Sequence, residues 1–126
     1  GIVRTGEELQ SGLDKLNEIK SDIKKVHAHA SAQCNPGWNE ALDLKNLIIT
    51  SEAVTRAALL REESRGAHTR LDFEGEHEDG LRYNIIIKKT EQGMLAEKII
   101  RESPPKELEE IAHASLDELE KGKNGA

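Results

Sequence analysis

The chain of 126 residues is long enough for one domain with a buried core. Hydrophobic residues make up 36% and aromatic residues only 2%, so a core must consist of Leu, Ile, Val and Ala, which favours packed helices over stacked sheets. The net charge is −6 and the basic residues are scattered among acidic ones, a pattern that argues against a surface for nucleic acid. We therefore expect a mainly helical domain with no nucleic-acid partner.

Neither a membrane span nor a secretory signal is visible in the sequence. No apolar run approaches the roughly 20 residues that cross a bilayer, and the first residues lack the basic and apolar regions of a signal peptide. Cys34 is the single cysteine and cannot form an internal disulfide. The chain starts at Gly1, which is expected for a processed product and for a piece of a longer protein. We expect no direct membrane insertion.

A first amphipathic helix is predicted over residues 5–29. Its apolar residues recur at spacings of three and four, which places them on one stripe: Leu9, Leu13, Leu16, Ile19, Ile23 and Val26. Thr5 and Glu8 have the spacing of a capping box at its start. The run Asn35-Pro36-Gly37 predicts that residues 31–37 form a loop.

A second, longer helix is predicted from Trp38 to Arg65, with Gly66 as its stop. Twenty-eight residues at 1.5 Å each give a length of about 42 Å, so the first helix can fold back along it as an antiparallel pair. Glu52 and Arg56 are one turn apart and predict a surface ion pair.

After the acidic run at residues 74–79, which predicts a solvated turn, the hydrophobic period changes from helical to alternating. Leu81, Tyr83, Ile85 and Ile87 alternate with polar residues, and a second alternating run covers residues 94–101. This pattern predicts a β-hairpin turning at Gly93. Past Ser103-Pro104-Pro105, the spacing of Leu108, Ile111, Leu116 and Leu119 predicts one short final helix.

The densest polar cluster is the motif segment, residues 61–73, at the end of the second helix. We predict that it docks onto another domain or subunit, because guanidinium and imidazole groups suit carboxylates and backbone carbonyls. On a helix, Arg61 and Arg65 would share one face. The alternative is that the same side chains pair with Glu52, Glu62, Glu63 and Asp72 inside this domain. The candidate docking residues are Arg61, Ser64, Arg65, His68 and Arg70.

The motif segment also carries a resemblance. Its Glu-Ser-Arg-Gly-Ala-His-Thr-Arg run at residues 63–70, with Leu71-Asp72-Phe73 after it and the second helix before it, resembles the C-terminal helical domain of the flavoprotein subunit of succinate dehydrogenase and fumarate reductase. Residues 1–5 resemble the link by which that family enters the domain. The resemblance is dense over residues 1–79. It departs at Glu74, where the family often has proline.

The resemblance implies that residues 1–126 form the single C-terminal helical domain of a longer flavoprotein. Within it, residues 1–79 would hold the helical pair and motif segment, residues 80–103 the hairpin, and residues 104–126 the last helix and tail. The fold class is mainly α: an antiparallel pair of long helices, or a three-helix, spectrin-repeat-like bundle, with a small β-hairpin. The family has a further helix before the position of Gly1, so the last helix, a second copy or the longer polypeptide would fill the apolar groove of the pair.

For the longer protein the resemblance implies FAD-dependent interconversion of succinate and fumarate, with electrons passing through an iron–sulfur subunit to or from quinone. Its partners would be the flavin-binding domain and the iron–sulfur subunit, and a homodimer of the present chain is also considered. The location would be the cytoplasm, or the cytoplasmic face of the inner membrane through partner subunits.

The sequence predicts no catalytic, cofactor or metal residue in this chain. It lacks the Gly-rich turns that hold the phosphates of FAD, NAD or ATP. His27, His29 and Cys34 match no structural zinc spacing. We therefore expect the chain to be inactive alone. The alternatives are a free-standing helical interaction module and the C-terminal domain of L-aspartate oxidase, which is disfavoured by Ala67 and by the hairpin.

Overall fold

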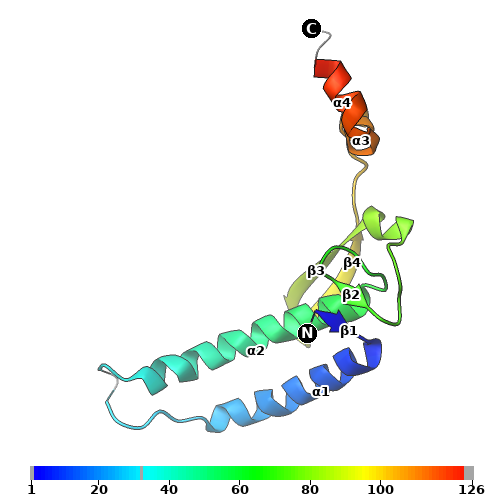
Figure 1. Ribbon diagram of the computed structural model, residues 1–126. Coiled ribbons are helices and arrows are strands. Elements are labelled where there is room, and N and C mark those ends of the chain that lie inside the picture. The colour runs from blue at the N-terminus through cyan, green and yellow to red at the C-terminus, as the bar shows by residue number, and fades with distance from the viewer. Residues whose placement is uncertain (1, 32, 124–126) are drawn as a thin grey trace.

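The computed structural model describes residues 2–31 and 33–123, and the side chains as far as residue 119. Its body is an antiparallel pair of long helices, α1 (Gly6–Asp22) and α2 (Pro36–Leu60), with a β-hairpin lying across the C-terminal half of α2 (Figure 1). A 3-10 helix, η1 (Ile23–Lys25), extends α1 towards the loop at the tip. The predicted helical pair is thus confirmed.

Local chemistry explains where α1 starts. The Thr5 hydroxyl accepts a hydrogen bond from the backbone N–H of Glu8 at 3.2 Å, and the Glu8 carboxylate accepts one from the N–H of Thr5 at 3.0 Å. The capping box is therefore present as predicted. The helix is shorter than the predicted 5–29, because the chain leaves the α conformation after Asp22 and becomes extended at Val26.

The second helix begins and ends earlier than the sequence predicts. Pro36 occupies its first turn, where a missing N–H costs nothing, so two residues assigned to the loop belong to the helix. The helix ends at Leu60, and Arg61 is already extended. Gly66 is therefore not its stop; with a φ of +57° it lies in a later turn. The prediction that Arg61 and Arg65 share a helix face is wrong for the same reason.

Two pairs of strands complete the body. The short strands β1 (Val3–Arg4) and β2 (Thr69–Arg70) pair in parallel and bring the start of the chain to the motif segment. The antiparallel hairpin consists of β3 (Tyr83–Thr90) and β4 (Gly93–Ile100), joined by Glu91 and Gln92. Gly93, at a φ of +122°, makes the tight turn that the sequence predicted. Leu81 is not in a strand but in the 3-10 helix η2 (Glu78–Arg82).

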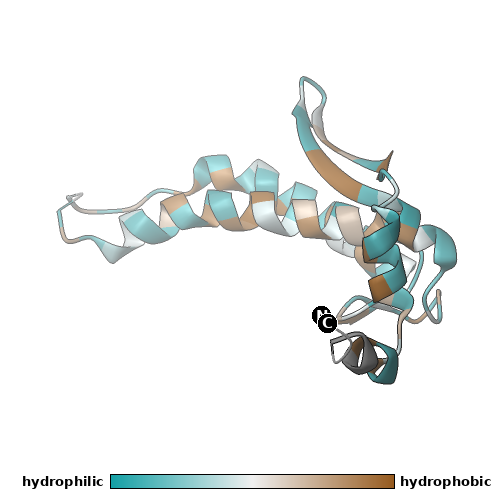
Figure 2. Ribbon diagram, turned by 90° about the horizontal axis from the view of Figure 1, so that it is seen from above, coloured by the Kyte–Doolittle hydropathy of each residue, from teal (hydrophilic) through white to brown (hydrophobic). Residues whose placement is uncertain are grey.

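The end of the chain differs from the prediction of one final helix. Two short helices, α3 (Lys106–His113) and α4 (Leu116–Lys123), follow an extended stretch through Pro104 and Pro105. Both lie beyond the hairpin, away from the helical pair (Figures 1 and 2). The last helix therefore does not fill the groove of the pair, and of the two predicted arrangements the described residues form the antiparallel pair and not the three-helix bundle.

The hydrophobic core of the body is small. Among the described residues, the buried hydrophobic side chains are Leu13, Ile48 and Ala58. Glu52 is only 2% exposed and lies between the helices, where it accepts hydrogen bonds from Lys20 of α1 at 2.7 Å and from Arg56 at 2.9 Å. The predicted Glu52–Arg56 pair is present, but it is buried on the carboxylate side. No helix in the described part of the chain is both long and apolar enough to cross a membrane.

Candidate functional site

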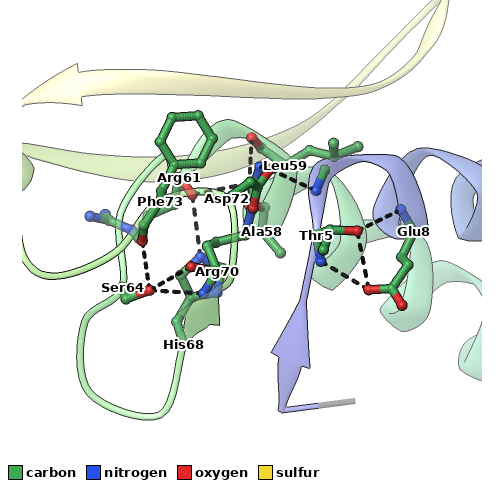
Figure 3. A network of polar contacts seen from close by, with 11 residues as sticks. Thr5, Glu8, Ala58, Leu59, Arg61, Ser64, His68, Arg70, Asp72 and Phe73 are labelled. Carbon is green, nitrogen blue, oxygen red and sulfur yellow. Dashed lines mark hydrogen bonds and ion pairs between the residues drawn. The ribbon is translucent and has the colours of Figure 1, made fainter.

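The motif segment forms a compact polar clasp where α1 begins and α2 ends (Figure 3). Glu63 is 1% exposed and Arg70 is 3% exposed, and Ser64 between them in the chain is half-buried. Burial of a carboxylate and a guanidinium is costly unless each is paired and hydrogen-bonded. The hydrogen-bond and ion-pair partners of Glu63 and Arg70 therefore determine whether this region stabilises the fold.

Arg70 closes the C-terminal end of α2. Its Nη1 donates to the carbonyl oxygens of Ala58 at 2.9 Å and of Leu59 and Arg61 at 3.3 Å. The Ala58 and Leu59 carbonyls belong to the last turn, where no intrahelical donor is available and the helix dipole is negative, and Arg61 directly follows that turn. A buried guanidinium thus performs the capping that the sequence assigned to Gly66.

Asp72 connects this cap to the first turn of α1. The Arg70 guanidinium donates to the two Asp72 carboxylate oxygens at 2.8 and 2.7 Å, and the backbone N–H of Gly6 donates to the same carboxylate at 2.8 Å. Hydrogen bonds from Arg70 hold the pKa of Asp72 well below its usual range. The negative carboxylate lies at the positive end of α1, and the positive guanidinium lies at the negative end of α2.

Glu63 is the centre of the second half of the clasp. Its carboxylate pairs with Arg61, and it accepts hydrogen bonds from Arg65 Nε and from the backbone N–H of His77, each at 3.1 Å. Burial acts to raise the pKa of Glu63, but the hydrogen bonds from Arg65, His77 and Arg61 outweigh it and lower the pKa to about 2. Glu63 is therefore ionised at neutral pH.

Arg65 ties the clasp to the acidic run that follows it. Its guanidinium donates to the Glu76 carboxylate at 2.8 Å and to the His77 carbonyl at 3.0 Å. Residues 74–79 are exposed, which agrees with the predicted solvated turn, and Glu76 among them is also ion-paired with Arg65. Arg61, on the other side of Glu63, lies over the Tyr83 ring at 4.9 Å and so reaches the hairpin.

Ser64 and His68 fix the backbone of the segment. The Ser64 hydroxyl accepts from the N–H of Arg70 at 2.9 Å and lies 2.8 Å from the Phe73 carbonyl, to which it donates. His68 lies between Arg4 Nη1 and the Arg61 carbonyl, each at 3.3 Å. Since Arg4 is a donor and the carbonyl an acceptor, neutral His68 carries its proton on Nε2. Burial and the neighbouring arginines lower the pKa of His68, which favours this neutral form.

All five candidate docking residues therefore have partners within the chain. Arg61 and Arg65 pair with Glu63, and Arg70 pairs with Asp72, as the alternative interpretation held; the predicted role of Glu52 as a partner of this segment is not seen, because Glu52 pairs with Lys20 and Arg56. Glu62 lies 3.9 Å from Lys98 of the hairpin. The five side chains lie close together because the chain folds around Glu63 and Arg70 after α2 ends, and not because they share one helix face.

The sequence did not single out Gly80 or Gly6, although both complete the clasp. A Cβ atom on Gly80 would lie 2.1 Å from Oε1 of Glu63, so only glycine allows the chain to pass over this carboxylate. The signal that was available is the isolated glycine after an acidic run, which is typical of close backbone approach.

The clasp should make stability depend on pH in the acidic range. The folded-state pKa of Glu63 is below its usual value of 4.5, so the stabilisation is fully present above pH 4.5 and is lost as the pH falls towards 2. We expect this group to contribute a loss of about 3 kcal/mol over that window, measured by urea unfolding at a series of pH values. Glu63→Gln should show a smaller slope; an unchanged slope would mean that Glu63 does not carry the effect.

Comparison with known proteins places this geometry in a family. Residues 1–110 match the family described as the fumarate reductase flavoprotein C-terminal region. The chain belongs to this family. The match covers the helical pair, the clasp, the hairpin and the start of α3, and it confirms the resemblance that the motif segment indicated.

Individual relatives agree with the family match. A polypeptide of the fumarate reductase (CoM/CoB) of Methanothermobacter marburgensis is 34% identical over 90 residues, which are 71% of this chain and 16% of that polypeptide. The L-aspartate oxidase of Yersinia pestis is 36% identical over 73 residues, 58% of this chain and 12% of the enzyme. This chain thus spans less than a fifth of the length of these relatives.

A solved structure shows the same fold over nearly the whole chain. The Mycobacterium smegmatis Sdh1 complex in its apo form matches with a TM-score of 0.76 and 33% identity, covering 96% of this chain and 21% of that chain. The similarity therefore includes the hairpin and continues towards the C-terminal end.

The family implies FAD in the complete flavoprotein, but the described residues do not fit an FAD site. The guanidinium groups of Arg61, Arg65 and Arg70 are used by carboxylates and carbonyls of the clasp. The sequence offers no Gly-rich phosphate turn beside them.

Proposed function

We propose that this chain is the C-terminal domain of a succinate dehydrogenase or fumarate reductase flavoprotein. In that protein it braces the flavin-binding domain and presents a surface to partner subunits, including the iron–sulfur subunit, while FAD and the dicarboxylate are bound elsewhere in the polypeptide. The longer protein then interconverts succinate and fumarate and exchanges electrons with quinone, in the cytoplasm or at the cytoplasmic face of the inner membrane.

The proposal is supported by a contrast between two regions. The polar side chains of the clasp have partners within the chain, whereas large apolar side chains of the helical pair are exposed. Large apolar side chains of α2, including Leu47 and Val54, which are seven residues apart and share a helix face, are more than 40% exposed, although the family match assigns the segment to a folded flavoprotein. Uncovered apolar surface of this extent is typical of a protein interface. The clasp residues Arg61, Ser64, Arg65, His68 and Arg70 contribute to docking by holding that surface in a fixed orientation.

Two alternative functions are an enzyme that acts on another substrate and a binding module with no reaction of its own. The L-aspartate oxidase relatives make an oxidase of L-aspartate the competing enzyme; they match 58% of this chain in sequence, whereas the fumarate reductase (CoM/CoB) polypeptide matches 71%. A free-standing interaction module would bind a partner helix in the same apolar surface without any flavin.

The test begins with the native polypeptide, isolated from its source and identified by peptides of this sequence. We expect a protein several times larger than 14.0 kDa, with flavin absorbance that bleaches on addition of succinate and not of L-aspartate. Bleaching by L-aspartate would replace the proposal with the oxidase. A colourless protein of this size would replace it with the interaction module.

In that longer protein, Leu47→Ser together with Val54→Ser should lower flavin retention and recovery of the iron–sulfur subunit. The same pair of changes should leave the unfolding free energy of the present chain within about 0.5 kcal/mol, because both side chains are exposed. Ile48→Ser is the matched control: it is the buried neighbour on the same helix and should destabilise both proteins. Equal flavin retention in the exposed-site variant and in the wild type would contradict docking through α2.

A further inference from the structure

Two lysines border an apolar groove at the tip of the helical pair, and an acidic segment lies beyond the hairpin. At the tip of the helical pair, η1, the following loop and the start of α2 enclose a groove of about 360 Å³, here called the tip groove. Its apolar lining includes Ile23, Val26, Trp38 and Leu42, and Lys24 and Lys45 border it. No carboxylate lines it among the described residues, and neither lysine has an ion pair in the described part of the chain.

The acidic arm, residues 102–119, includes α3 and the start of α4 and lies beyond the hairpin. It contains six acidic residues and one lysine. Leu108 and Ile111, which lie on one stripe of α3, are 57% and 55% exposed, and Glu107 and Glu110 flank them. This is the pattern of an amphipathic helix that docks in an apolar groove.

The groove and the arm cannot meet within one molecule. Figure 1 shows the helical pair running to the left of the hairpin and α3 and α4 lying above the hairpin, so the tip of the pair and the arm are far apart in one copy. In a pair of copies related by a twofold axis, docking of each arm in the other copy's groove gives a closed contact with two identical sites.

We propose that this chain self-associates through reciprocal docking of the acidic arm of one copy in the tip groove of another. Lys24 and Lys45 would meet Glu107 and Glu110, and Leu108 and Ile111 would cover the apolar floor beside Trp38. Charge complementarity selects this occupant over an uncharged helix, and opposite charge across an interface also fixes the direction of docking. Both surfaces belong to this chain whichever longer protein contains it.

The test uses the full chain and its single tryptophan, which lies in the proposed contact. Sedimentation should show a monomer–dimer equilibrium that weakens from low salt to about 0.5 M salt. Emission from Trp38, which is 47% exposed in the monomer, should shift to shorter wavelength in step with the dimer fraction. A monomer at every concentration, or a dimer that leaves Trp38 emission unchanged, would overturn the proposal.

Charge-reversal substitutions test whether the two lysines of the groove contact the two glutamates of the arm. Lys24→Glu with Lys45→Glu should raise the dissociation constant about tenfold or more, and Glu107→Lys with Glu110→Lys should do the same. An equimolar mixture of the two variants should recover one native contact per pair and form heterodimers. Lys15→Glu with Lys89→Glu changes the net charge equally at exposed positions outside the groove and should dimerise like the wild type. Failure of the mixture to associate, or binding of the groove only to another acidic protein, would reject reciprocal docking.

Discussion

Arg70→Met should lower the free energy of unfolding of this chain by about 4 kcal/mol, the range observed when one partner of a buried ion pair is removed. Arg70 is 3% exposed and donates to Ala58, Leu59 and Arg61 carbonyls as well as to Asp72. Methionine fills similar space but leaves the end of α2 and the Asp72 carboxylate without their donor. Urea unfolding followed by circular dichroism measures the loss.

Two other arginine substitutions give this measurement its controls. Arg70→Lys keeps the charge but lacks the planar fork, so it should recover only part of the lost stability. Arg82→Met removes a guanidinium that is exposed and pairs weakly with Asp79 at 3.5 Å, and it should change stability by less than about 0.5 kcal/mol. If Arg70→Met were as mild as Arg82→Met, the guanidinium would not be the cap of α2.

Gly80→Ala is expected to destabilise the chain by about 3 kcal/mol, although it adds a single methyl group. The new Cβ would lie 2.1 Å from Oε1 and 2.3 Å from Cδ of Glu63. That carboxylate cannot swing aside freely because Arg61, Arg65 and the His77 N–H hold it. Thermal unfolding of the variant and the wild type at neutral pH measures the effect.

A double-mutant cycle separates this contact from a general loss of backbone freedom. In a Glu63→Ala background the obstructing carboxylate is gone, so Gly80→Ala should cost much less than it does alone. Gly12→Ala is the opposite control: it lies within α1 with nothing near its missing side chain, and it should stabilise the chain by roughly 0.5–1 kcal/mol. Strict additivity of the changes at positions 63 and 80 would contradict the proposed clash.

The elements were predictable from sequence where local rules decide them. The Thr5–Glu8 capping box, the alternation on both sides of Gly93 and the long apolar period of α2 each depend on neighbours in sequence. The end of α2 was not predictable in this way, because Arg70 caps it from ten residues further along the chain. Local reasoning therefore chose Gly66, the nearest residue that commonly ends a helix.

The sequence identified which residues form the candidate site, but it did not predict how they are arranged in space. The sequence brought Arg61, Ser64, Arg65, His68 and Arg70 together as one group, and Glu63 and Asp72 were named as internal partners. What it could not supply was the contribution of distant backbone: the N–H groups of Gly6 and His77, and the passage of Gly80 over Glu63. The docking role itself stays a prediction, which the flavin experiment tests.

The hydrogen bond between the Gly6 N–H and the Asp72 carboxylate joins positions 66 residues apart, so it affects how the chain folds. During synthesis on the ribosome, the first helix emerges long before the carboxylate that secures its leading turn has been translated. Closing so large a loop should make this domain reach its native state more slowly than an ordinary two-helix hairpin of similar size.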